Sequence, residues 1–88
     1  MLAVLCLTAT CGSIATDRVF VERTGPDELL KLRAGPSLQF NVILGLPDGT
    51  ALNQKSCVTE LGQRWCLVSL ADAPGISGYV SADYLSGG

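Results

Sequence analysis

The segment that most constrains this chain runs from Leu30 to Thr50 and reads LKLRAGPSLQFNVILGLPDGT. Its first four residues alternate apolar and cationic side chains, so a strand there places both leucines on one face and both cations on the other. A Gly-Pro pair then ends the strand, because proline lacks the N–H that a ladder needs and fixes its own φ. A second apolar run follows and ends at Pro47-Asp48-Gly49, residue types that favour a tight turn. The segment therefore predicts two strands joined by a loop and followed by a turn.

Short apolar runs closed by turn residues recur along the rest of the chain. Runs at 19–21, 65–70 and 78–80 are rich in β-branched, aromatic and leucine side chains and predict further strands. The last of them leads into residues 82–85, which fit a single helical turn. No stretch carries the pattern of an amphipathic helix longer than one turn. The sequence therefore predicts an all-β fold of five to six short strands with a terminal single helical turn.

Several short sequence motifs in the chain, taken in order, resemble the pattern of bacterial SH3 (SH3b) domains, which occur in exported cell-envelope proteins. That pattern runs roughly L-N-V-R-S-G-P-S, an aromatic residue, V-I, L-P-x-G-T, W-x-x-V, G-W-V and Y-L. The matching words here are LKLRAGPS at 30–37, Phe40, VI at 42–43, LPDGT at 46–50, Trp65 with Val68, GYV at 78–80 and YL at 84–85. Tyr79 stands where the family usually has tryptophan, and Gln54 where it often has an apolar residue. The resemblance implies a small SH3-like barrel over residues 16–88.

The length and net charge of the chain limit the kinds of partner that it is expected to bind. The chain has 88 residues, with six Lys or Arg and eight Asp or Glu side chains, for a formal net charge of −2. No basic patch argues for nucleic acid or for an anionic membrane surface, so binding to nucleic acid is not expected. The length allows one domain, with a core so small that a covalent cross-link would help to stabilise it.

The first sixteen residues, MLAVLCLTATCGSIAT, carry no charged side chain and are typical of the hydrophobic and cleavage regions of a signal peptide. They are shorter than the ~20 residues that a spanning helix needs. Residues 1–15 are therefore expected to be an export signal, which places the protein in the periplasm or cell envelope. No Lys or Arg precedes the apolar run, so we expect either that the true translation start lies upstream or that the α-amino charge serves in its place.

Two ways of processing this signal remain open. The tripeptide SIA at 13–15 has small residues at both positions that a signal peptidase reads, which would give a soluble protein beginning at Thr16. Alternatively, the segment LTATC at 7–11, followed by Gly-Ser, resembles a degenerate lipoprotein box in which Cys11 becomes the lipidated N-terminus. The second interpretation would anchor the protein to a membrane through lipid.

Cys57 and Cys66 are the cysteines of the expected folded domain, and they flank a polar connection that contains Gly62. Two strands joined there would place the two side chains opposite each other, as a disulfide requires. A bridge is favoured in a small exported domain. A metal site would need more ligands, the chain has no histidine, and a redox pair is usually spaced Cys-x-x-Cys. We therefore predict a structural disulfide, and no metal or cofactor.

Catalytic residues are not evident. Without histidine the chain cannot form a Ser/His/Asp or Cys/His arrangement, and its glycines do not have the spacing of a phosphate-binding loop. The adjacent carboxylates of Asp27 and Glu28 lie next to turn residues and are interpreted as a solvated pair, not as an acid and base couple. The chain is not expected to be an enzyme.

The resemblance implies that a ligand would lie along a groove lined by aromatic side chains. Trp65, Tyr79 and Tyr84 are therefore the candidates for an exposed binding strip. Alternation along the strand places Trp65 on the face opposite Cys66 and Val68, so a binding role and a packing role both remain open for it.

Structural roles are also assigned from the sequence. Phe40 is expected in the core, and Tyr84 with Leu85 could also plug the end of the barrel. Arg33 is expected to hold a turn carbonyl or a carboxylate and not a ligand.

The resulting functional expectation is a non-catalytic binding or adaptor module of the cell envelope. The resemblance implies cell-wall peptide, that is peptidoglycan, or an envelope protein as the partner. The alternative is a small exported inhibitor or stabilising partner of one specific envelope enzyme, with the barrel serving only as a rigid platform.

Overall fold

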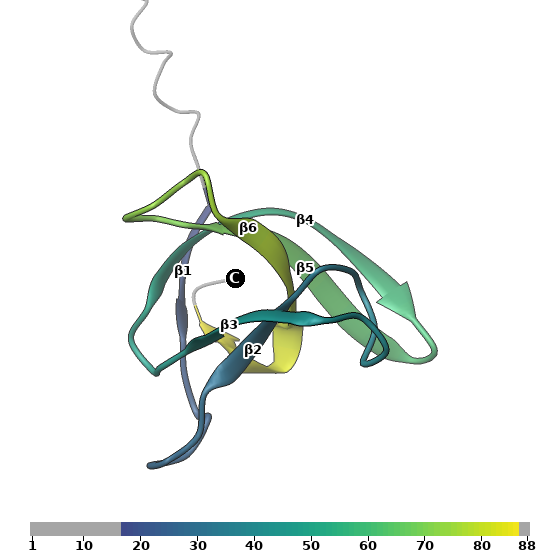
Figure 1. Cartoon of the computed structure of the whole chain (residues 1–88), viewed down its shortest axis with the longest axis horizontal. Coiled ribbons are helices and arrows are strands. Elements are labelled where there is room, and N and C mark those ends of the chain that lie inside the picture. The colour runs from purple at the N-terminus through teal and green to yellow at the C-terminus, as the bar shows by residue number, and fades with distance from the viewer. Residues whose placement is uncertain (1–16, 87–88) are drawn as a thin grey trace, which may run out of the picture.

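The computed structural model describes residues 17–86, which form an all-β fold in which one antiparallel sheet curls into a half-barrel (Figure 1). The elements are β1 (Asp17–Val21), β2 (Leu30–Arg33), β3 (Val42–Leu46), β4 (Ala51–Glu60), β5 (Gln63–Leu70), β6 (Ser77–Ser81), the 3-10 turn η2 (Ala82–Tyr84) and β7 (Leu85–Ser86). The predicted signal at 1–15, the start of the domain at residue 16 and the candidate lipidation site Cys11 lie outside the described residues. Within residues 17–86, no helix is long and apolar enough to cross a membrane.

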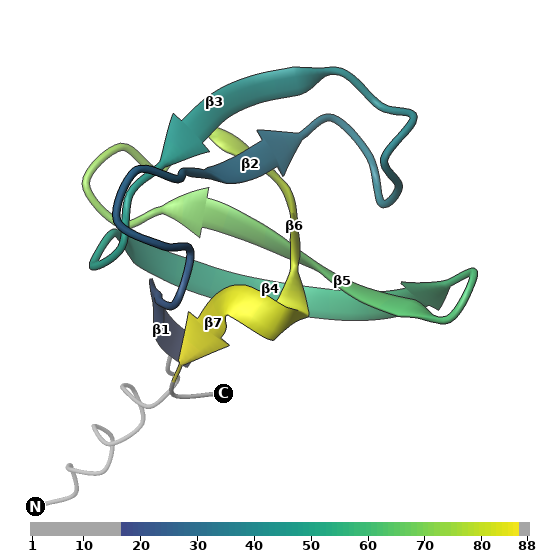
Figure 2. The same cartoon turned by 90° about the horizontal axis from the view of Figure 1, so that it is seen from below.

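The strands are ordered β3-β2-β6-β5-β4-β1-β7 across the sheet. The long β4 makes the curl, because its first residues pair with β1 while its whole length pairs with β5. A register shift between Gln54 and Ser56 lets this strand bend, as β-bulges do. Figure 2 shows the result, with β3 arching over one side and β4 and β5 extended along the other.

The sequence predicted five to six strands with the helical turn at the end. Residues 17–86 form seven strands, with one strand after the turn. The helical turn is confirmed as η2. The additional strand is β7, whose two residues pair with Phe20 and Val21 of β1. Two residues are too short to show a strand's period of two, so β7 could not be read from its own pattern.

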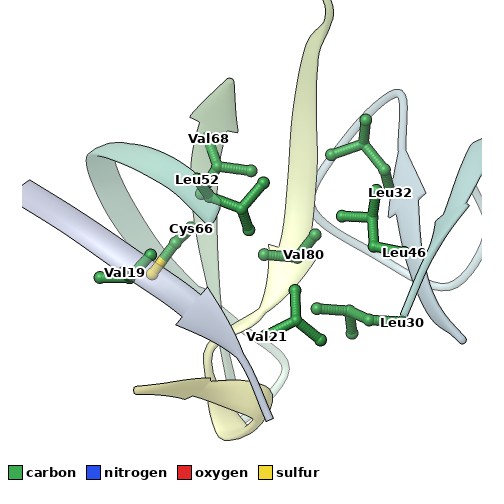
Figure 3. Close-up of a cluster of buried hydrophobic side chains, with 9 residues drawn as sticks. All are labelled: Val19, Val21, Leu30, Leu32, Leu46, Leu52, Cys66, Val68 and Val80. Carbon is green, nitrogen blue, oxygen red and sulfur yellow. The ribbon is translucent and has the colours of Figure 1, made fainter. Parts of the chain in front are cut away.

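The concave side of the sheet holds the core. Nine buried side chains form it: Val19, Val21, Leu30, Leu32, Leu46, Leu52, Cys66, Val68 and Val80. Figure 3 shows how side chains of β1, β2 and β6 meet there. Leu30 and Leu32 point inward together while Lys31 between them is exposed, as the alternation predicts. Val68, two residues after Cys66, is also fully buried.

Phe40 was expected in the core, but its side chain is 45% exposed. It precedes β3, in the loop 34–41 that joins β2 to β3, and its ring covers Gly35 of the same loop. A Cβ at Gly35 would lie 2.5 Å from a ring carbon of Phe40, so only glycine allows this contact. The ring therefore packs on its own loop and does not reach the barrel interior.

The predicted disulfide is present. Cys57 of β4 and Cys66 of β5 are direct cross-strand partners, with an S–S distance of 2.04 Å and a Cα–Cα distance of 4.0 Å. Cys66 is part of the core and Cys57 packs against it. The bridge therefore joins the two strands of this hairpin on the side of the sheet that faces the core.

Candidate binding groove

A groove of about 530 Å³ lies between three segments that are distant in the sequence. One wall is the loop 34–41, through residues 37–39, and the other is the tip of the β4–β5 hairpin. Trp65 of β5 and Tyr84 of η2 line the groove between these walls. Figure 2 shows the loop and the hairpin projecting to the same side of the molecule. A smaller pocket beside it shares four lining residues with the groove: Leu38, Trp65, Ser81 and Tyr84.

Trp65 lies on the face of β5 opposite Cys66, as the alternation predicts. The expectation of an exposed strip is wrong for this residue, because its side chain is only 5% exposed. Leu38 of the loop and Tyr84 of η2 line both pockets next to it. Residues far from Trp65 in the sequence therefore cover the outer face of β5, and the indole lies at the floor of the groove.

The indole N–H of Trp65 is a hydrogen-bond donor without an acceptor among the described residues. It is also not a buried unpaired atom, since the described residues contain no buried side-chain N or O atom that lacks a partner. Trp65 lines the groove, which makes its N–H a candidate donor for a ligand there.

Tyr84 lies next to Trp65, and Tyr79 does not. Tyr84 is part of η2 and lines both pockets. Tyr79 is on β6, where it pairs with Leu67 of β5 and Arg33 of β2, and it lines neither pocket. Of the three predicted site residues, the structure therefore brings Trp65 and Tyr84 together and leaves Tyr79 farther along the same face of the sheet.

Arg33 fixes the wall that carries Leu38. Its Nη1 donates to the main-chain oxygens of Leu38, at 3.2 Å, and of Phe40, at 3.0 Å. The backbone N–H of Gln39 donates to Ser37 Oγ at 3.1 Å within the same loop. The prediction that Arg33 holds turn carbonyls is confirmed, and the loop presents Leu38 with its side chain 73% exposed.

The opposite wall ends in a two-residue turn, Leu61-Gly62, with φ values of +52° and +81°. Positive φ at both central positions describes a type I′ turn, which glycine, asparagine and aspartate favour. Leucine at the first position is therefore unusual, and its side chain is 99% exposed. Sequence reasoning missed Leu61, although an apolar residue before Gly62 in a polar connection was a signal that could have found it.

Gln63 connects this hairpin to η2. Its Nε2 donates to Ser81 Oγ at 2.9 Å and lies 3.4 Å from Asp83 Oδ2. The backbone N–H of Asp83 donates to the same Ser81 hydroxyl at 3.3 Å, which caps the 3-10 turn. From the other side, Arg23 Nη2 donates to the main-chain oxygen of Asp83 at 2.7 Å. Side-chain hydrogen bonds thus tie both the hairpin and the segment around Arg23 to η2.

A second polar contact lies outside the groove and joins the β3–β4 turn to the segment between β1 and β2. Thr24 donates to Asp48 Oδ1 from its backbone N, at 3.0 Å, and from its hydroxyl, at 2.6 Å. The hydroxyl bond and the backbone bond lower the pKa of Asp48 below its ordinary value of 3.8. This carboxylate therefore serves as a structural acceptor.

The groove offers apolar surface, a free N–H and two carboxylates, those of Glu60 and Asp83. Within residues 17–86, no group of three or more His, Cys, Asp or Glu side chains is placed to hold a metal ion. The arrangement can bind an extended chain by packing and hydrogen bonding.

No family model matches this chain, and neither a curated protein nor a solved structure matches it.

Proposed function

We propose that this protein is a non-catalytic binding module of the cell envelope, which holds an extended peptide segment in the groove above Trp65. The partner would be cell-wall peptide or a segment of an envelope protein. The observation that carries the proposal is a buried aromatic floor with a free N–H, set between two walls that hydrogen bonds hold in place. Binding sites of this kind combine apolar surface with a few oriented polar groups.

We also propose that the half-barrel is an SH3-like barrel of the bacterial kind. Three features support this: the order of the short sequence words, the curled antiparallel sheet, and the 3-10 turn between the last two strands. Export to the periplasm or cell envelope is part of the same proposal. The Cys57–Cys66 disulfide supports it, because such bridges persist in oxidising compartments.

The test is a pull-down with the exported, processed protein as bait, against purified peptidoglycan and against a whole envelope extract, with mass spectrometry of what is captured. Tyr84→Ala shortens a partly exposed side chain of the groove, whereas Ile76→Ala shortens a partly exposed side chain in the β5–β6 connection, which lines neither pocket. We expect Tyr84→Ala to lose the captured partner and Ile76→Ala to retain it. Equal capture by both variants would place the binding site elsewhere.

A further inference from the structure

The charge of the groove is the first feature that specifies a ligand. Glu60 and Asp83 both line it, and no Lys or Arg side chain does. The one ion pair within residues 17–86 joins Arg23 to Glu22, at 3.6 Å, so neither groove carboxylate forms a direct ion pair with a described cation. Arg23 also contacts η2, but at the main-chain oxygen of Asp83. A ligand lying here meets two carboxylates, of which that of Asp83 also accepts from Gln63 Nε2 at 3.4 Å.

The conformation of Leu61 is the second feature. A non-glycine residue at positive φ is disfavoured sterically, and a fully exposed leucine also orders water around its side chain. Neither cost is offset by a contact within the folded chain, because the side chain is 99% exposed. Leu61 does line the groove, where it faces the same space as Leu38. A bound apolar group would cover both leucines.

The third feature is the floor. Trp65 is buried, and its N–H has no acceptor among the described residues, so it can donate to a ligand carbonyl. An extended peptide offers a main-chain carbonyl together with side chains that alternate to either side.

From these three features, we propose that the groove selects extended peptides that combine a cationic side chain with apolar ones. The cation lies against Glu60 and Asp83, the apolar side chains pack against Leu38 and Leu61, and a peptide carbonyl accepts from Trp65 Nε1. The proposal rests on the proposed function, since it specifies the ligand of the same groove.

The test uses four fluorescein-labelled, end-capped nine-residue peptides and fluorescence anisotropy with the full chain. Three are matched in apolar residues and carry Lys, Gln or Glu at two central positions, and the fourth is the Lys peptide with its apolar residues replaced by serine. We expect the Lys peptide to bind about three- to tenfold more tightly than the Gln peptide, because its cations face the two exposed carboxylates of the groove. The Glu peptide should bind more weakly than the Gln peptide, and the serine peptide should not bind.

Two variants locate the effect. Glu60→Gln combined with Asp83→Asn should remove the preference for the Lys peptide over the Gln peptide. Leu61→Asn should raise the melting temperature, because asparagine tolerates positive φ, and should weaken binding of the Lys peptide. Ile76→Asn, in the β5–β6 connection, is the matched control and should leave binding of the Lys peptide unchanged.

Equal binding of the Lys and Glu peptides would overturn the inference and leave the proposed function standing. Capture of peptidoglycan without binding of any of the four peptides would do the same. Failure to bind the peptides, peptidoglycan and every protein of an envelope extract would overturn both. Unchanged affinity in Leu61→Asn would show that Leu61 is not a contact residue and would contradict its part in the proposal.

Discussion

Replacing Cys57 and Cys66 together by alanine should lower the thermal midpoint substantially while preserving the fold. The bridge closes a loop between residues that are nine apart in the sequence. Alanine is the better replacement at position 66, because that side chain is buried in the core and a serine hydroxyl there would lack a partner.

The size of the effect follows from the entropy that the cross-link removes from the unfolded chain. For a loop of this length the chain-entropy relation gives about 2.6 kcal/mol at 25 °C. In a domain of 60 to 100 residues each kcal/mol moves the midpoint by roughly 4 to 8 °C, so the expected drop is about 10 to 20 °C. Truncating Cys66 within the core adds to this loss.

Circular dichroism melts of the oxidised protein and the double variant measure the difference. An intact mass about two daltons below the fully reduced value establishes the bridge in the exported protein, since its formation removes two hydrogens. Equal midpoints for the oxidised protein and the variant would refute the role assigned to the bridge. Two freely alkylatable thiols in the native exported protein would refute its presence.

Three further outcomes are expected. The pKa of Asp48 is lower in the folded than in the unfolded chain. Its bonds with Thr24 therefore stabilise the fold at pH values above the unfolded pKa, and this stabilisation is lost as pH falls through the folded pKa. The urea concentration at the unfolding midpoint should fall below about pH 4, and Asp48→Asn should make that fall smaller. Gly78→Ala should lower the urea midpoint by the equivalent of about 1 to 3 kcal/mol, since its Cβ would lie 2.7 Å from the main-chain oxygen of Arg33, and an unchanged midpoint would contradict this contact. If the lipoprotein interpretation holds, Cys11→Ala should move the protein from membranes to the soluble fraction or leave it unprocessed, whereas a soluble unmutated protein beginning at residue 16 would decide for ordinary cleavage.

Local patterns predicted much of this fold, because alternation and turn chemistry depend on neighbouring residues alone. The segment 30–33 is a strand with its leucines inward, and Cys57 and Cys66 meet across a hairpin that contains Gly62. The face of the sheet that carries Trp65 also follows from alternation along β5.

The errors arose where distant segments decide the outcome. Trp65 is covered by a loop and a 3-10 turn that lie far from it in the sequence, which alternation cannot show. The ring of Phe40 packs on its own loop through a contact that only Gly35 permits. β3 lies at the edge of the sheet, and its residues 42–44 are all apolar and all exposed. Strand position in a sheet is a property of the whole topology.

The dependence on distant segments also explains which residues of the groove the sequence identified. Trp65 and Tyr84 were both identified as aromatic candidates, but their proximity depends on how η2 follows β6. Leu61 was missed, because its significance lies in a positive φ and full exposure. The residue type shows neither property, although an apolar residue before Gly62 in a polar connection was a signal that could have found Leu61.

Trp65→Phe tests most directly whether the floor of the groove binds the partner, because it keeps an aromatic ring and removes the N–H. The variant should unfold cooperatively, and its affinity for the partner captured in the pull-down should fall by about 2- to 13-fold, the loss expected for one hydrogen bond. The ratio of affinities should be measured by titration at a temperature where both proteins are folded. Unchanged affinity of the folded variant would contradict a binding role for Trp65 Nε1 and would leave Trp65 as a packing residue.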